Sequence, residues 1–243
     1  MRYAVLAHRG DADAEPLARE LARRPADVVL LWEDDLFLGS RFTHRLGPRG
    51  CETELACEDG RRLDSTGLNG VVCRLTHAAP PQFAAAAAAD RDYAGAEAAA
   101  LLLSWLSGLA CPVVNPASPR GLSGPVLSRL EWSLLAARAG LGCSFRVEPG
   151  ADPEEPASVD PIDGPARELL VVGPNVLGEA SPELARSCVE LARTAGCPVL
   201  GIAVAGSVSA GPRQTRFLAA RTLPPLGAAG AAAVAELLAG GGG

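Results

Sequence analysis

The sequence predicts an α/β protein organised around parallel strands. Residues 3–7 (YAVLA) and 28–32 (VVLLW) are short apolar runs typical of buried strands, and a helical pattern that ends before Pro25 lies between them. A β–α–β unit of about thirty residues is the signature of a right-handed parallel crossover. Further runs of the same kind follow at residues 70–75, 112–114, 169–172 and 199–204. Strands and helices therefore alternate through both halves of the chain.

After the second strand the pattern changes to short strands with turn signals. Residues 42–46 and 51–57 flank a Gly-Pro-Arg-Gly turn, and an Asp-Gly turn at residues 59–60 follows. An Asp-Gly pair between short strands is a strong hairpin signal. We therefore expect a hairpin insertion before the buried strand at residues 70–75.

Two helices are predicted around these strands. Asp13 is placed to cap the first, which runs to about Arg24. The second runs from about residue 90 to 106 and carries Tyr93, Glu97 and Trp105 at helical spacing along one stripe. If Arg74, at the end of the strand before it, faces Glu97, the two side chains form a buried charge-assisted pair. The alternative is that Arg74 captures the carboxylate of a ligand.

Residues 111–140 form a predicted strand–loop–helix unit. A polar loop at residues 115–124 leads into a helix from about Ser123 to Ala139, which Gly140 closes. Side chains of such a loop and the first amides of the helix can bind an anion. The plainer interpretation is a turn with Ser123 as the helix cap. The loop residues offered to a ligand are Asn115, Ser118, Arg120 and Ser123.

The residues after the first strand, His8 and Arg9, form a second candidate binding site. They follow the carboxyl end of a predicted parallel strand, where open α/β sheets bind ligands. The sequence identifies no partner that would make His8 a general base, and the three histidines show no metal-ligand spacing. Residues 33–35 (EDD) could hold a divalent cation, although an acidic turn at a strand end is commoner.

The predicted domain organisation is two α/β lobes. Residues 1–147 form the first lobe, which contains the parallel sheet and the hairpin insertion. Residues 148–167 are acidic and rich in proline without periodicity, which is typical of a linker. Residues 168–243 form a smaller second lobe, in which Ser181 caps a helix, residues 212–221 form a strand and residues 228–238 form a last helix.

Composition excludes several classes of function. The formal charge of −6 argues against nucleic acid or an anionic membrane as the main partner. All 22 residues of the Lys+Arg total are arginine, so a Walker A lysine and a Schiff-base lysine are excluded. Seven cysteines without CxxC spacing indicate neither a disulfide framework nor a zinc site. With no signal peptide or membrane-spanning run, we expect a cytoplasmic protein.

The order of these elements resembles the N-terminal lobe of the ATP-grasp ligases, the pre-ATP-grasp domain. The resemblance rests on the hairpin, the strand GVVCRL, the helix with Tyr93 and Glu97, and the VVNP segment before a helix ending AGL. It covers about residues 1–145 and is closest to RimK-like and peptide-modifying members. In the second half, SPELARSCVELARTAGCPVLGIAV resembles the family's helix and metal-binding strand, and TRFLAARTLPPL resembles the strand that ends in Glu-x-Asn.

The second half departs from the family at the residues that carry the chemistry. The resemblance implies ATP, Mg²⁺ and an acyl-phosphate intermediate, which need carboxylate ligands for the metal and cations for the phosphates. This chain has GIAV at residues 201–204 where the family has Asp, and AAR at residues 219–221 where it has Glu and Asn. Arg can partly replace Lys at a phosphate, but Ala cannot replace Asp at a metal.

We therefore expect a degenerate ATP-grasp-like protein with no catalytic residue, no metal and no cofactor. It would act as an accessory in peptide or natural-product modification, and would bind a small anionic molecule or a peptide carboxylate, with an authentic ATP-grasp ligase or a second copy as partner. The alternative is an ATP-dependent carboxylate–amine ligase that uses Arg, ATP and Mg²⁺ and is completed by a partner subunit. Structural dimerisation through the Ala-rich helices is a third possibility.

Overall fold

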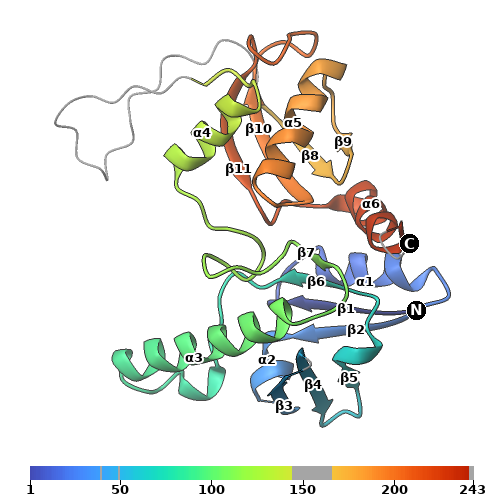
Figure 1. Ribbon diagram of the computed structural model, residues 1–243, viewed down its shortest axis with the longest axis vertical. Coiled ribbons are helices and arrows are strands. Elements are labelled where there is room, and N and C mark those ends of the chain that lie inside the picture. The colour runs from blue at the N-terminus through green and yellow to red at the C-terminus, as the bar shows by residue number, and fades with distance from the viewer. Residues whose placement is uncertain (39, 49, 144–165, 241–243) are drawn as a thin grey trace. The chain divides into compact units, whose positions relative to one another are not determined.

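The computed structural model describes residues 1–38, 40–48, 50–143 and 166–240 (Figure 1). The chain divides into two compact units. The first contains Met1–Val126 together with Pro225–Gly243, and the second contains Leu127–Pro224. The predicted linker lies almost entirely outside the described residues. None of the described helices is both long enough and apolar enough to cross a membrane.

A four-stranded parallel sheet forms the centre of the first unit, as predicted. Its strands are β1 (Arg2–Ala7), β2 (Asp27–Trp32), β6 (Gly70–Arg74) and β7 (Val113–Val114), in the order β2-β1-β6-β7. Each neighbouring pair is parallel. Both β1 and β6 are buried nearly throughout, so the sheet must be covered on both faces.

Helices and a second sheet provide that cover. Ala4 and Leu6 of β1 pack in one core cluster with Trp105 of helix α3 (Ala88–Ser107). On the other face, helix α1 (Ala14–Ala22) contacts β1 and the C-terminal helix α6 (Gly227–Gly240), which lies beside it in Figure 1. Because β-strand side chains alternate, the two faces of β1 contribute to two separate packing layers.

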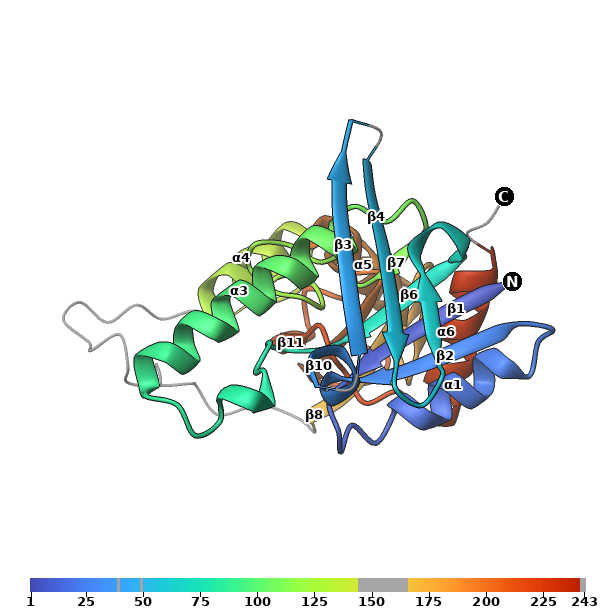
Figure 2. The ribbon, with the colours of Figure 1, turned by 90° about the horizontal axis from the view of Figure 1, so that it is seen from below.

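The predicted hairpin insertion is present as a three-stranded antiparallel sheet. Strand β3 (Ser40–Gly47) pairs with β4 (Gly50–Cys57), and β4 pairs with β5 (Arg62–Asp64), as Figure 2 shows. Leu55 and Leu63 join the core cluster that contains Trp105. The acidic residues 33–35 do not form a simple turn but the start of a short helix, α2 (Glu33–Phe37), because Asp35 accepts a hydrogen bond from the backbone N–H of Trp32.

In its described residues, the second unit consists of an antiparallel sheet and two helices. Strands β8 (Ala166–Val172), β9 (Asn175–Leu177), β10 (Val199–Ala205) and β11 (Arg216–Arg221) lie in the order β11-β10-β8-β9. Helices α4 (Arg129–Arg138) and α5 (Pro182–Thr194) contribute to its core. Ser181 caps α5 as predicted, its Oγ accepting from the N–H of Leu184 at 3.3 Å.

Helix α4 begins later than the sequence suggested. The side chain of Ser128 and that of Glu131 form a capping box, so the first helical residue is Arg129 and Ser123 is not the cap. On this helix Trp132 and Ala136 are buried, whereas Leu130 and Leu134 are exposed.

The prediction that Tyr93, Glu97 and Trp105 share one stripe of helix α3 facing the core is only partly correct. Trp105 is fully buried, but Tyr93 is 69% exposed and Glu97 is exposed too. The side chains that face the core instead are Ala94, Ala98, Leu102, Trp105 and Leu106. Small alanines let this helix approach the rest of the unit closely, which leaves the longer side chains on its outer side.

Candidate functional site

A group of charged side chains of the first unit lies at the carboxyl edge of the parallel sheet. In the strand register, Ala7 of β1 lies opposite Trp32 of β2 and Arg74 of β6. The residues that follow these three positions must therefore emerge at the same edge. Ligands of open α/β sheets bind at this edge, which makes it a candidate site.

Arg74 is held by two aspartates of the loop after β1. Its guanidinium donates to the Asp11 carboxylate at 2.6 and 3.1 Å and to Asp13 Oδ2 at 3.2 Å. The Arg74 side chain is 7% exposed, so these charge-assisted bonds replace water almost completely. The pairing of Arg74 with Glu97 that we expected is wrong, because Glu97 lies on the exposed side of α3.

Asp13 also connects the loop to the C-terminal helix. Its Oδ1 accepts from the backbone N–H of Gly227, the first residue of α6, at 3.2 Å. A carboxylate at a helix N-terminus satisfies a free amide and interacts favourably with the helix dipole. Asp13 stands at the N-cap position of α1, as predicted, but makes no side-chain cap bond there. Its side chain instead accepts hydrogen bonds from Arg74 and from the first amide of α6.

The three acidic side chains of residues 33–35 all have basic partners. Glu33 bonds to His8, Asp34 accepts from Arg9 Nε at 2.5 Å, and Asp35 accepts from both terminal nitrogens of Arg61 at 2.8 and 3.0 Å. The bonds to Asp35 raise the pKa of the Arg61 guanidinium above its ordinary value. The acidic cluster is therefore largely neutralised by the protein itself.

His8 has the positioned partners that the sequence could not identify. Its Nδ1 bonds to Glu33 Oε2, and its Nε2 accepts from the backbone N–H of Thr76 at 3.0 Å. Thr76 Oγ1 also lies 2.8 Å from Nδ1 of His77, and the two imidazole rings stack with centroids 4.5 Å apart. Thr76 and His77 follow β6 as His8 follows β1, so their proximity could have been inferred from parallel pairing of these two strands.

The loop at residues 115–124 is tied to the sheet and to itself. Ser118 and Gly121 exchange two backbone hydrogen bonds at 2.9 and 3.0 Å, and Ser118 Oγ accepts from the N–H of Arg120 at 3.2 Å. Ser123 is 4% exposed and donates to the carbonyl of Leu75 at 2.7 Å, and Asn115 is also buried. The outer part of this loop that a ligand can reach contains Ser118 and the exposed Arg120.

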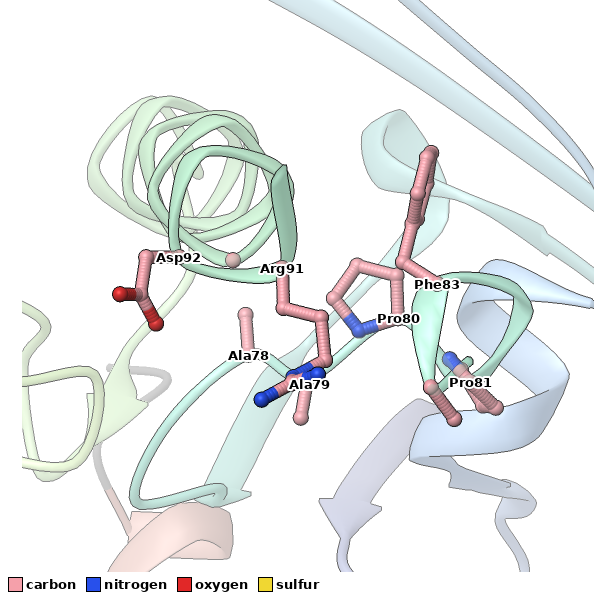
Figure 3. A pocket seen from close by; sticks show the side chains of 9 residues that line it. Ala78, Ala79, Pro80, Pro81, Phe83, Arg91 and Asp92 are labelled. Atoms are coloured by element: carbon pink, nitrogen blue, oxygen red, sulfur yellow. The ribbon is translucent and has the colours of Figure 1, made fainter. Parts of the chain in front are cut away.

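Two pockets open on the first unit among its described residues. One, of about 410 Å³, lies between the connector at residues 78–84 and the start of α3, and its walls are mainly alanine and proline. Figure 3 shows Arg91 reaching from α3 toward this connector. The guanidinium of Arg91 donates to the carbonyl of Ala86, which lies between the connector and α3, at 2.7 Å. The other, of about 380 Å³, is lined by Arg9, Glu15, Arg19 and Trp32 among others.

Burial makes six of the cysteine thiols in the described part of the chain less acidic than a free thiol. Burial raises the pKa of the thiols of Cys188 and Cys197 to about 12. Thiolates form in electropositive, partly exposed surroundings, which is the opposite situation. Burial also raises the pKa of the other shifted thiols, which are Cys57, Cys73, Cys111 and Cys143.

The second unit does not fit Mg²⁺ and ATP in its described strands. Mg²⁺ is bound through carboxylate oxygens and phosphates, and Glu168 is the single acidic residue on the four strands β8 to β11. Its carboxylate lies 2.7 Å from the guanidinium of Arg221. Strand β10 is apolar throughout and almost completely buried, so it offers no ligand to a metal.

No family model and no curated protein sequence matches the chain. Solved structures do. The macrocyclase MdnC bound with precursor peptide MdnA from Microcystis aeruginosa MRC is similar at a TM-score of 0.76 and 11% identity, over 99% of this chain and 100% of that chain. A RiPP-associated ATP-grasp ligase from Chryseobacterium gregarium, in complex with ADP and a leader and core peptide, is similar at 0.70 and 11%, over 98% and 96%.

A third similar structure is the ATP-grasp ligase PsnB complexed with minimal precursor, Mg and ADP, at a TM-score of 0.71 and 14% identity, over 99% of this chain and 97% of that chain. These similarities extend over both compact units. They agree with the resemblance drawn from the order of the sequence elements. The chain therefore has the fold of these ATP-grasp ligases.

Proposed function

We propose that this protein is a peptide-binding accessory with an ATP-grasp fold that performs no ATP-dependent ligation of its own. The observation that carries the proposal is the lone carboxylate on the strands of the second unit, Glu168, and its pairing with Arg221. A ligase of this type must hold Mg²⁺ and a triphosphate. An apolar β10 and a chain without lysine support the loss of both functions.

The ligand in this proposal is a peptide or another small molecule that carries a carboxylate. The similar macrocyclase MdnC is bound with a precursor peptide, and the Chryseobacterium gregarium ligase with a leader and core peptide, which supports a peptide here. The outer loop, with Ser118 and Arg120, is the proposed contact for the carboxylate, since Arg binds carboxylates in a planar, bidentate geometry. His8 and Arg9 are a second proposed contact, beside the pocket of about 380 Å³.

Asn115, Ser123 and Arg74 have a different role in this proposal. They are buried, and the hydroxyl of Ser123 and the guanidinium of Arg74 are committed to Leu75 and to Asp11 and Asp13. They would position the loops that touch the ligand rather than touch it themselves. An authentic ATP-grasp ligase that acts on the same peptide would perform the ligation. A second copy of this chain is the alternative partner.

An activity assay separates this proposal from the alternative of an active ligase. The full chain is incubated with a carboxylate-rich peptide, ATP and Mg²⁺, alone and with an ATP-grasp ligase that modifies that peptide, and ADP release is measured. We expect no ADP above background from the chain alone, and a faster or tighter reaction of the ligase in its presence. Arg120→Ala should weaken that stimulation, whereas the matched exposed variant Arg186→Ala should not. ADP release by the chain alone would favour the ligase.

A further inference from the structure

We propose that His8, Glu33 and His77 bind a divalent transition metal ion, for which Zn²⁺ is the reference. One ligand atom from each of these side chains lies within 4.8 Å of the others, among the residues the structure describes. The three side chains follow β1, β2 and β6 at one edge of the parallel sheet. The sequence did not predict this group because its three members are far apart in the chain. This proposal does not depend on the proposed function.

The donor set determines the class of metal. Two imidazole nitrogens and one carboxylate oxygen suit Zn²⁺ and related ions, whereas Mg²⁺ and Ca²⁺ prefer oxygen ligands. Zn–ligand bonds of about 2.0–2.1 Å put tetrahedral ligand atoms roughly 3.3 Å apart. The three ligand atoms therefore have to approach one another modestly, and the exposed His77 has the freedom to do so. A fourth position stays open for water or for a ligand carboxylate.

Thr76 is placed to orient both imidazoles. Its Oγ1 lies 3.1 Å from His8 Nε2 and 2.8 Å from His77 Nδ1. A hydroxyl oxygen has two acceptor lone pairs, so it can accept N–H from both rings. With metal bound, that arrangement would leave His8 Nδ1, beside Glu33, and the other nitrogen of His77 free of protons. Metal-bound histidines usually donate their second N–H in this way.

Proton balance is kept in this scheme. Without metal, Nε2 of His8 accepts from the N–H of Thr76, so the ring proton is on Nδ1 and is shared with Glu33. When the metal binds Nδ1, the proton moves to Nε2, which gives up the bond from the Thr76 N–H and donates to Thr76 Oγ1 instead. Both imidazoles stay neutral and the carboxylate stays ionised. The competing interpretation is that His8 and Glu33 form a hydrogen-bonded pair whose only role is structural.

The test uses Co²⁺ and Zn²⁺ on the full chain. Co²⁺ should give the visible bands of a tetrahedral or five-coordinate site without the sulfur charge-transfer band of a cysteine site, and Zn²⁺ should displace it one for one. His77→Ala removes an exposed ligand without disturbing the His8–Glu33 pair, so it should leave the fold intact. It should weaken Zn²⁺ binding by at least about 100-fold, since loss of a supporting partner alone costs roughly 10–100-fold.

Three further variants complete the test. Glu33→Gln should lose binding as His77→Ala does, and Thr76→Val should weaken it by about 10–100-fold. The matched control Asp34→Asn removes the neighbouring carboxylate, which is bonded to Arg9, and should leave the affinity unchanged. The proposal is overturned by the absence of stoichiometric binding, by a sulfur charge-transfer band, or by an affinity that His77→Ala does not change.

Discussion

Replacement of Arg74 tests whether this buried arginine holds the first unit together. The change Arg74→Met keeps much of the side-chain volume and removes the charge. Asp11 and Asp13, 14% and 17% exposed, would then lose their cation. Breaking a buried pair by removing one partner costs about 3–5 kcal/mol. Because both aspartates keep some contact with water, and Asp13 keeps its bond to Gly227, we expect about 3 kcal/mol.

The assay follows unfolding of the first unit by tryptophan fluorescence in urea. A Trp132→Phe background leaves Trp32 and Trp105, which both belong to that unit, as reporters. The control Arg186→Met breaks an exposed i,i+3 pair with Glu183 and should change stability by less than about 0.5 kcal/mol. In a double-mutant cycle with Asp11→Asn, the two losses should not add, because the side chains share one interaction.

If Arg74→Met lowers the free energy of unfolding by less than about 1 kcal/mol, Asp11 and Asp13 do not need the Arg74 guanidinium, and Arg74 does not hold the first unit together. Arg74 would then be available to bind the carboxylate of a ligand, as the other prediction from the sequence allowed. A loss of the expected size, with unchanged peptide binding in the remaining folded protein, would assign Arg74 to the structure of the site.

Three further predictions concern packing and pH. The pKa of Cys188 is about 12 in the folded protein against 9.0 in the unfolded chain, so above pH 9 the folded state keeps a proton that the unfolded state releases. The free energy of unfolding should therefore fall as the pH rises above about 9, by about 1.4 kcal/mol at pH 10. In urea titrations, Cys188→Ala should reduce this loss of stability at alkaline pH. Ser123→Ala leaves the carbonyl of Leu75 without its hydrogen-bond donor and should lower the free energy of unfolding by about 1–2 kcal/mol in the same titration. An unchanged free energy of unfolding would mean that water replaces the hydroxyl. In Gly70→Ala, the new Cβ would lie 2.8 Å from the side chain of Leu238 in α6, so we expect the free energy of unfolding to fall by about 1–3 kcal/mol. The same change should cost less in a Leu238→Ala background. Equal losses with and without Leu238→Ala would contradict this packing.

The local patterns of the sequence were sufficient for most strands and turns, although they did not predict β9. The continuous apolar runs of β1, β2 and β6 are long enough to identify without tertiary information. The Asp-Gly turn likewise located the β4–β5 hairpin. The start of α4 was missed because Ser123 and Ser128 are both capping residues. Glu131, three residues after Ser128, is the signal that distinguishes them, since only Ser128 has a capping-box partner.

The site was less predictable because its contacts are long-range. Arg74 and Asp11 are 63 residues apart, and His8 and Thr76 are 68 apart. Their proximity depends on which strands pair and in what register, which periodicity alone does not give. Association of α6 with α1 depends in the same way on tertiary packing of two helices at opposite ends of the chain. The predicted lobe limits fall partly in residues 144–165, outside the described part, and stay a prediction.

We expect that the chain does not bind the nucleotide that ligases of its fold use. Isothermal titration calorimetry of the full chain with Mg·ATP tests this directly, with an active ATP-grasp ligase as the positive control. No saturable heat is expected from the chain, because β10 offers no carboxylate and Glu168 is paired with Arg221. Saturable binding in the micromolar range, lost when Mg²⁺ is chelated, would contradict it.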